Sequence, residues 1–179
     1  MKISMAALAI ALVGGATAWA QTHQPYAGLQ TRPVKALSDQ QIADLKAGRG
    51  MGLALAAELN GYPGPVHVLE LATSLGLSDE QRAKVAELFD AMKREAVPLG
   101  ERLIAAETGL DRQFADRTIT AASLGEATRD IASVQGELRL AHLKYHLATL
   151  ELLTSEQAAR YATLRGYGGA HHAPGQHGR

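Results

Sequence analysis

Two histidines one helical turn apart are the residues of this sequence best suited to bind a metal ion. His142 and His146 are four positions apart, so on a helix their side chains project from one face on adjacent turns. Two imidazoles in this spacing can share one ion, and they prefer zinc, nickel or copper. A structural or sensing site needs further ligands, for which His67 and Glu137 are the nearest candidates. The alternative, which we favour, is that both histidines flank a helical hairpin without binding metal.

Beyond this pair, the reactive side chains form no catalytic pattern. The chain has no cysteine, which excludes disulfide bonds, thiolate metal ligands and cysteine nucleophiles. It also lacks the G-x-S-x-G, H-E-x-x-H and Walker sequences. His171, His172 and His177 lie in the C-terminal tail, where we favour solvation over metal scavenging. We therefore expect a protein that is not an enzyme and requires no cofactor, with zinc or nickel as the candidate metal ions.

Charge and composition narrow the partners and the fold class. The chain carries 18 basic and 18 acidic residues, and this balance gives no electrostatic reason to expect a nucleic acid as partner. Hydrophobic residues make up 46% of the chain but aromatic residues only 4%. An apolar content that consists largely of Ala and Leu is typical of packed helices rather than of a sheet. We therefore expect an all-α fold.

Three copies of a short pattern predict where three helices begin. The copies read LSDQQ at 37–41, LSDEQ at 77–81 and LTSEQ at 153–157. In each copy the Ser or Thr can accept a hydrogen bond from a backbone N–H, while the Gln three positions later bonds back to the N–H of the Ser or Thr. The second and third copies consist of Leu77, Ser78 and Gln81 and of Leu153, Thr154 and Gln157. We expect helices to begin near residues 39, 79 and 155.

Two long apolar stripes predict a helical hairpin. The first stripe comprises Val85, Phe89, Met92, Ala96, Leu99, Leu103, Ala106 and Leu110, and the second comprises Leu124, Ala127, Ile131, Val134, Leu138, Ala141, Tyr145, Ala148 and Leu152. Within each stripe the spacings alternate between three and four, as on one face of a helix. The polar stretch 116–120 between them is short, so the two helices must pack antiparallel. Thr120 is the expected cap of the second helix.

Pro98 and Gly100 interrupt the first stripe without changing its register. A proline removes a backbone hydrogen bond and bends a helix, so we expect one bent helix rather than two. The fold class is therefore all-α: a long bent antiparallel helical hairpin with additional shorter N-terminal and C-terminal helices. Before the hairpin we expect a helix from 39 toward Asn60, weakened by three glycines, a break at 60–65 and a short helix over 66–75.

The first twenty residues have the features of an export signal. A positive residue, Lys2, precedes the apolar run 5–13, which is too short to span a bilayer. Ala18 and Ala20 fit a cleavage site, which predicts a mature chain that begins at Gln21. We expect a periplasmic protein without stable membrane insertion. Its organisation would be a signal peptide over 1–20, an irregular arm over 21–36, a helical domain over 37–167 and a flexible Gly/His-rich tail over 168–179.

The second helix of the predicted hairpin has a second apolar face. Leu140, Leu143, Leu147 and Leu150 lie opposite the stripe that packs on the first helix. A helix that is apolar on two sides must bury both. The terminal helices of the same chain could cover the extra face, or it could bind a client protein or a second copy. The sequence favours neither alternative.

The repeated Leu-Ser/Thr-x-x-Gln pattern, the export signal, the absence of cysteine and the long hairpin together resemble the Spy/CpxP family of periplasmic proteins. That family carries an LTxxQ motif, and the copies at 77–81 and 153–157 lie at the two places where the family has it. The resemblance covers about Leu71 to Arg165. The first helix and the Gly-Tyr-Pro-Gly-Pro loop look like an added segment.

The resemblance implies an ATP-independent chaperone of the envelope-stress response, which dimerises into a cradle and shields unfolded protein clients. Other relatives inhibit an envelope sensor kinase or bind metals. The alternative function is therefore a periplasmic heavy-metal-binding sensor, or a regulator that acts on the periplasmic domain of a sensor kinase. This chain differs from the chaperone member in not being basic.

Overall fold

The structure is a computed structural model and describes residues 26–167. Over this range the chain is helical and contains no strand, in the order η1 (Leu29–Thr31), α1 (Asp39–Lys46), α2 (Leu55–Glu58), α3 (Pro65–Glu70), α4 (Ala72–Leu75), α5 (Asp79–Ala115), α6 (Ala121–Glu151) and α7 (Ser155–Leu164). The expected signal peptide and the tail with His171, His172 and His177 lie outside the described residues. No helix in the described part is long and apolar enough to cross a membrane.

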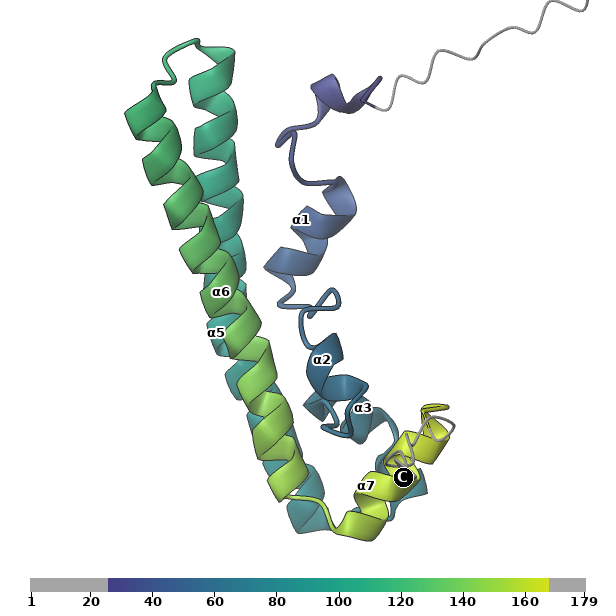
Figure 1. Ribbon diagram of the computed structural model, residues 1–179. Coiled ribbons are helices and arrows are strands. Elements are labelled where there is room, and N and C mark those ends of the chain that lie inside the picture. The colour runs from purple at the N-terminus through teal and green to yellow at the C-terminus, as the bar shows by residue number, and fades with distance from the viewer. Residues whose placement is uncertain (1–25, 168–179) are drawn as a thin grey trace, which may run out of the picture.

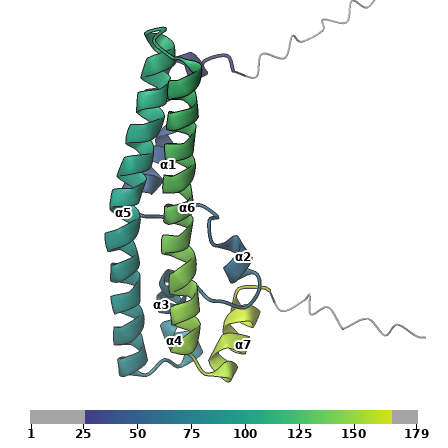
Figure 2. The same cartoon turned by 60° about the vertical axis from the view of Figure 1, so that its left-hand side comes forward.

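Two long helices dominate the molecule and confirm the predicted hairpin. α5 has 37 residues and α6 has 31, and they lie side by side in both ribbon views (Figure 1, Figure 2). Apart from Leu124, which is exposed near the tip, the two stripes face the core, where Ala96, Leu103, Ile131, Val134 and Leu138 are buried. Thr120 caps α6 as expected, with its hydroxyl accepting a hydrogen bond from the N–H of Ser123 at 3.1 Å.

α5 runs through Pro98 as one helix, as the unbroken stripe predicts. Pro98 is exposed, so its ring points away from the packed face. Gly100 is buried, and a Cβ atom there would lie only 2.5 Å from the carbonyl oxygen of Leu45. The glycine therefore allows the backbone of α1 to approach α5 closely, and α1 packs on the hairpin at this point.

The region between α1 and α3 differs from the expected helix over 39–60. α1 ends at Lys46, because Gly48 and Gly52 adopt positive φ angles of 66° and 84° with Met51 at 44° between them. A helix cannot pass through residues with left-handed backbone, so the prediction of one helix up to Asn60 is wrong. The expected helix over 66–75 is present as two short helices, α3 and α4, which meet at Leu71.

The helices at the three repeated patterns begin where the sequence predicts. α1, α5 and α7 start at residues 39, 79 and 155, and each is preceded by a complete capping box. The hydroxyl of Ser78 accepts a hydrogen bond from the N–H of Gln81 at 3.1 Å, and the side-chain oxygen of Gln81 accepts one from the N–H of Ser78 at 3.0 Å. The same pair of bonds closes on Thr154 and Gln157.

The second and third patterns also bind each other, which sequence spacing alone does not show. The side-chain amide of Gln81 donates to the side-chain oxygen of Gln157 at 2.8 Å, and the amide of Gln157 donates back at 3.1 Å. Gln81 also donates to the carbonyl of Leu152 at the end of α6. This reciprocal amide pair joins the start of α5, the end of α6 and the start of α7 at the base of the hairpin (Figure 1).

The segment from α1 to α4 covers one side of the hairpin. It runs along the hairpin from η1 near the tip toward the base, where α7 folds back beside it (Figure 1). A second apolar cluster holds this base together and consists of Val68, Ala72, Leu75, Leu77, Val85 and Tyr161. The N-terminal segment therefore determines which face of α6 is buried in the lower half of the molecule.

Candidate functional site

The three predicted histidine ligands line one small cavity. His67 from α3 and His142 and His146 from α6 surround a space of about 140 Å³. The carboxylate-bearing Glu58 of α2 and the thioether-bearing Met92 of α5 also line this space. Side chains from four helices therefore converge on this point, although they are far apart in the sequence.

His146 is held in one orientation by the backbone. Its side chain is buried, and its Nδ1 lies 2.7 Å from the carbonyl oxygen of Tyr62. Since a carbonyl only accepts, Nδ1 carries the proton and donates this hydrogen bond. Gly64 is required here, because a Cβ at this position would lie 2.9 Å from Cε1 of His146. The loop Tyr62–Gly64 between α2 and α3 therefore fits closely against this imidazole.

His142 is the least satisfied polar group of the described chain. It is only 2% exposed, and its Nε2 is buried without a hydrogen-bond partner. Burial, and next the neighbouring His146, lower the pKa of His142 below its ordinary value, because both disfavour the charged imidazolium. His142 is therefore neutral at pH 7 and has a nitrogen available to a ligand.

The other proposed ligands are less well placed. His67 is half-buried and its Nδ1 lies 3.1 Å from Oε2 of Glu70, so it is partly occupied. Glu137 forms an ion pair with Arg102 of α5 at 2.9 Å and does not line the cavity. Among residues 26–167 no three His, Cys, Asp or Glu side chains are close enough together to hold a metal ion. His142 and His146 therefore supply two nitrogen ligands, and a third metal ligand is not in place among residues 26–167.

Glu58 is a functional candidate that the sequence did not reveal. It is 7% exposed, and the hydroxyl of Tyr161 and the N–H of Gly64 both donate to its carboxylate, the latter at 3.1 Å. Arg165 and His146 each place a nitrogen 3.7 Å from one of its oxygens. Burial, and next the bond to Glu58, raise the pKa of Tyr161. Glu58 stands alone in an apolar stretch, so no pattern in the sequence indicates its role.

The outward face of α6 carries the predicted leucines. Leu140 and Leu147 are 61% and 54% exposed, and Leu143 and Leu150 are half-buried. α2 and α3 contact α6, and Gly50 and Gly64 lie beside His142 and His146, while Leu140 and Leu147 stay largely exposed. Within residues 26–167, nothing prevents another molecule from contacting Leu140 and Leu147.

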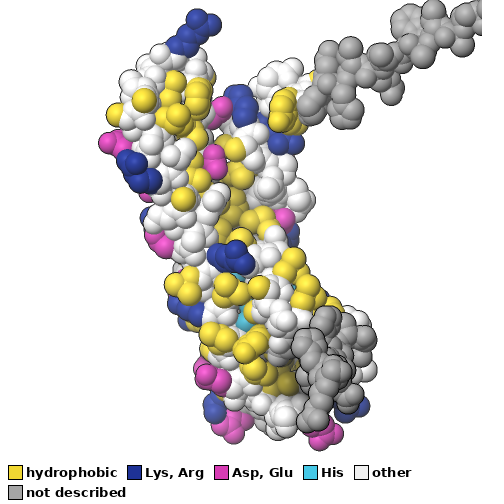
Figure 3. Space-filling view, in the orientation of Figure 1, with side chains coloured by type: hydrophobic (Ala, Val, Ile, Leu, Met, Phe, Trp, Pro, Cys, Tyr) yellow, Lys and Arg dark blue, Asp and Glu magenta, His cyan; other side chains and the backbone are white. Residues whose placement is uncertain are grey.

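Exposed apolar side chains on α2 extend this surface. Leu55 and Leu59 are 54% and 57% exposed, and α2 contacts α6. In the space-filling view apolar side chains gather over the lower part of α6 and over α2 (Figure 3). We call Leu140, Leu143, Leu147 and Leu150 the leucine face of α6, and it lies next to a second apolar strip on α2.

Comparisons with protein-family models, with curated proteins and with solved structures find no match for this chain. The histidine cavity and the leucine face are the features of residues 26–167 that bear on its function.

Proposed function

We propose that this protein is an exported chaperone that holds unfolded protein segments on the leucine face of α6 without using ATP. One observation carries the proposal. α6 exposes two leucines by more than half while it buries two histidines, the reverse of the usual distribution of these residue types. Leucines kept in contact with water over several turns of a helix indicate a surface that binds another apolar molecule.

Several features support a holding function rather than a catalytic one. The leucine face is open and is flanked on α6 by charged residues, including Lys144 and Glu151, so an apolar segment can bind without entering a closed pocket. Contacts of this kind are weak, and weak contacts dissociate quickly without an energy source. The export signal and the Leu-Ser/Thr-x-x-Gln patterns, which resemble those of the Spy/CpxP family, support a role in the periplasm under envelope stress.

The test is suppression of aggregation. Light scattering from a chemically denatured client should fall when the purified secreted protein is present at a stoichiometric ratio. A Leu140→Gln/Leu147→Gln variant should keep its melting temperature but suppress aggregation at least fivefold less. The matched control is Phe114→Gln/Leu124→Gln, which removes two exposed apolar side chains near the hairpin tip and should suppress as the unmodified protein does.

Two results would contradict the proposal. The first is that no ratio of protein to client reduces light scattering. The second is that both double variants lose suppression equally, since the leucine face would then have no special role. If sedimentation shows that the leucine face instead closes a homodimer that excludes the client, the face is an assembly surface. In that case the dimer would bury the leucine face, and only the monomer of this protein could bind a sensor-kinase domain through it.

A second candidate function is binding of a divalent metal ion, and the histidine cavity favours it. The buried Nε2 of His142 has no partner, and the Nδ1–H of His146 is bound to a backbone carbonyl, as is usual for histidines that ligate metals. Nitrogen ligands beside the thioether of Met92 suit zinc, nickel or copper rather than calcium. His67 or Glu58 would complete the set only after a local rearrangement. A metal-dependent regulator of a sensor kinase would use such a site.

Calorimetric titration of zinc and nickel tests this second candidate. The comparison needs the secreted protein, a His142→Ala/His146→Ala variant and a chain that ends at Tyr167. Loss of binding only in the double variant would support the cavity. Loss only in the shortened chain would assign binding to the tail histidines and leave the cavity pair with a structural role.

A further inference from the structure

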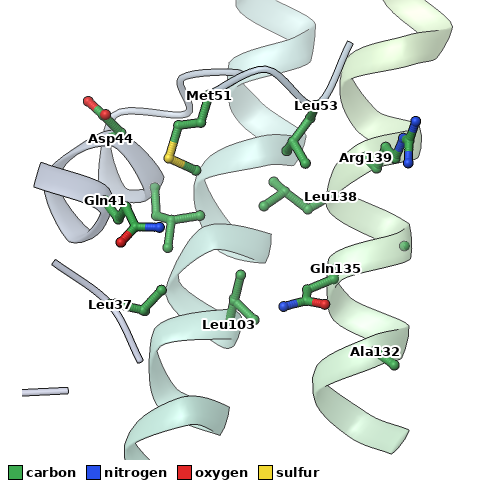
Figure 4. A pocket seen from close by; sticks show the side chains of 12 residues that line it. Leu37, Gln41, Asp44, Met51, Leu53, Leu103, Ala132, Gln135, Leu138 and Arg139 are labelled. Atoms are coloured by element: carbon green, nitrogen blue, oxygen red, sulfur yellow. The ribbon is translucent and has the colours of Figure 1, made fainter. Parts of the chain in front are cut away.

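A groove beside α6 shares no lining residue with the histidine cavity or with the leucine face. Its volume is about 710 Å³, within the range of small-molecule sites. It lies between α1, the loop that follows α1, the middle of α6 and Leu103 of α5. Six large apolar side chains and the methyl group of Ala132 line it; the six are Leu37, Leu45, Met51, Leu53, Leu103 and Leu138 (Figure 4).

The apolar lining is purely aliphatic and thioether in character. Leu45, Leu103 and Leu138 are buried and form the floor, while Met51 is 42% exposed at the rim. No aromatic ring lines the groove, so it offers no stacking surface for a flat ligand. A flexible methionine at the mouth can adjust to a chain of variable shape. The lining therefore suits a saturated acyl chain better than an aromatic ring or a nucleobase.

On the α1 side of the rim, the polar groups already form most of their hydrogen bonds within the protein. Asp44 already accepts hydrogen bonds from Gln40 at 2.9 Å and from Arg49 at 2.6 Å, so its charge is compensated. The side-chain oxygen of Gln41 is used by the capping box and accepts from the N–H of Ser38. Only the amide N–H groups of Gln41 therefore remain to serve a ligand.

The α6 side of the rim offers donors and positive charge. Gln135 and Arg139 are four residues apart and both line the groove, so they lie on adjacent turns of one face. Arg139 forms no ion pair with another residue in the range 26–167, and the amide of Gln135 points toward Leu103 (Figure 4). Amide and guanidinium donors without acceptors are suited to a carboxylate.

We propose that this groove binds a free long-chain fatty acid, with the acyl chain on the leucine floor and the carboxylate beside Gln135 and Arg139. The aliphatic lining favours an acyl chain, and the unused donors of Gln135 and Arg139 favour a negatively charged headgroup. Asp44 lies on the opposite wall with α1, so an anionic headgroup is directed to α6. This site is independent of client binding at the leucine face.

Gly136 allows the groove to be filled without disturbing the fold. It lines the groove, and a Cβ there meets no other atom within 4 Å. A Gly136→Trp variant should therefore place its ring in the groove, and replacing a glycine inside a helix favours the helix. Gly109→Trp is the matched control, because Gly109 also lies inside a long helix with nothing within 4 Å of its Cβ and lines a different hollow.

Titration calorimetry with laurate below its micelle concentration is the measurement. Laurate should bind the secreted protein with one-to-one stoichiometry, and dodecyltrimethylammonium, with the same chain and opposite charge, should bind at least tenfold more weakly. Gly136→Trp should abolish laurate binding and Gly109→Trp should preserve it. Arg139→Gln should weaken binding about tenfold, whereas Arg129→Gln on the same helix should not.

Three outcomes would overturn the proposal. These are no heat of binding with laurate, equal affinity for the two headgroups, and binding that survives Gly136→Trp. The Leu140→Gln/Leu147→Gln variant separates this site from the proposed function. It should bind laurate unchanged, and if it does not, laurate binds to the leucine face and the groove is not a fatty-acid site.

Discussion

In the second half of α6, one side buries polar side chains and the other side exposes leucines. A usual amphipathic helix has the opposite distribution. The side that packs against the N-terminal segment buries His142, His146 and Thr149, whereas the side that faces outward carries the leucine face. The hydroxyl of Thr149 is satisfied by the carbonyl of Tyr145 at 2.7 Å, but His142 keeps an unpaired nitrogen. The buried polar groups are thus incompletely compensated, which costs stability.

This comparison indicates that neither side is optimised for stability alone. Exchanging a buried, unpaired histidine for an apolar residue, or an exposed leucine for a polar one, would bring α6 closer to an ordinary helix. Departures from the usual pattern are concentrated at functional sites in natural proteins. Both sides of this half of α6 are therefore candidates for function, and each can be tested against the ordinary core of the hairpin.

The largest expected effect separates the core from the leucine face. Leu138→Asp should destabilise the protein by about 4 kcal/mol, because it buries an unpaired charge at a position that is 3% exposed. Leu147→Asp introduces the same group at a position that is 54% exposed and should change stability by less than about 0.5 kcal/mol. Urea denaturation followed by circular dichroism measures both. Equal destabilisation of the two variants would show that the leucine face is part of the core.

A pair of glycines provides a similar comparison on α5, with a smaller effect. Gly100→Ala should destabilise the protein by about 2 kcal/mol, because the added methyl group meets the carbonyl of Leu45 at 2.5 Å. Gly109→Ala, where a Cβ meets nothing within 4 Å, should stabilise it by about 0.5–1 kcal/mol through helix propensity. Thermal melts of the two variants give the signs. If Gly100→Ala is also stabilising, α1 does not pack closely on α5.

The smallest expected effect concerns His142 and pH. Since its pKa is lowered in the folded protein, the unfolded chain takes up the proton first as the pH falls. The contribution of His142 to stability is therefore complete above about pH 6.5 and is lost as the pH falls from there toward its folded pKa. The stability of the unmodified protein should fall relative to His142→Leu by at most about 1.4 kcal/mol per pH unit below pH 6.5.

This pH dependence is measured as a difference between two proteins. At pH 7.5 His142→Leu should be as stable as the unmodified protein or slightly more stable, because the unpaired buried nitrogen is removed. A difference between the two proteins that stays constant from pH 8 to pH 5 would show that His142 does not titrate with folding. His146, His67 and Glu58 are kept in both proteins, so the difference reports His142 together with its interaction with His146.

The sequence predicts the regular parts of the fold well, because their causes are local. Capping boxes form within four residues, and the alternating three-four spacing of the stripes follows directly from helical geometry. The helix starts at 39, 79 and 155, the unbroken α5 and the cap at Thr120 are therefore confirmed. The region 47–60 was predicted incorrectly, because three residues there adopt positive φ, and glycine spacing alone does not distinguish a weak helix from a broken one.

The candidate sites depend on contacts between distant parts of the chain and were only partly foreseen. The spacing of His142 and His146 predicted their shared face, but not that α2 and α3 bury it. Glu58 reaches Tyr161 across 103 positions, and a single acidic residue gives no periodic signal. The groove proposed to bind a fatty acid is formed by α1, its following loop, α5 and α6, so it appears only when these elements are assembled.

The reciprocal amide pair of Gln81 and Gln157 has a consequence for the order of folding. These residues are 76 positions apart, and closing so long a loop in an unfolded chain is entropically unfavourable. Once α5 and α6 pair, however, the end of α6 already lies beside the start of α5, and only the few residues from 152 to 157 remain to be ordered. We therefore expect the hairpin to form first and the two amides to lock afterwards, with little additional loss of chain entropy.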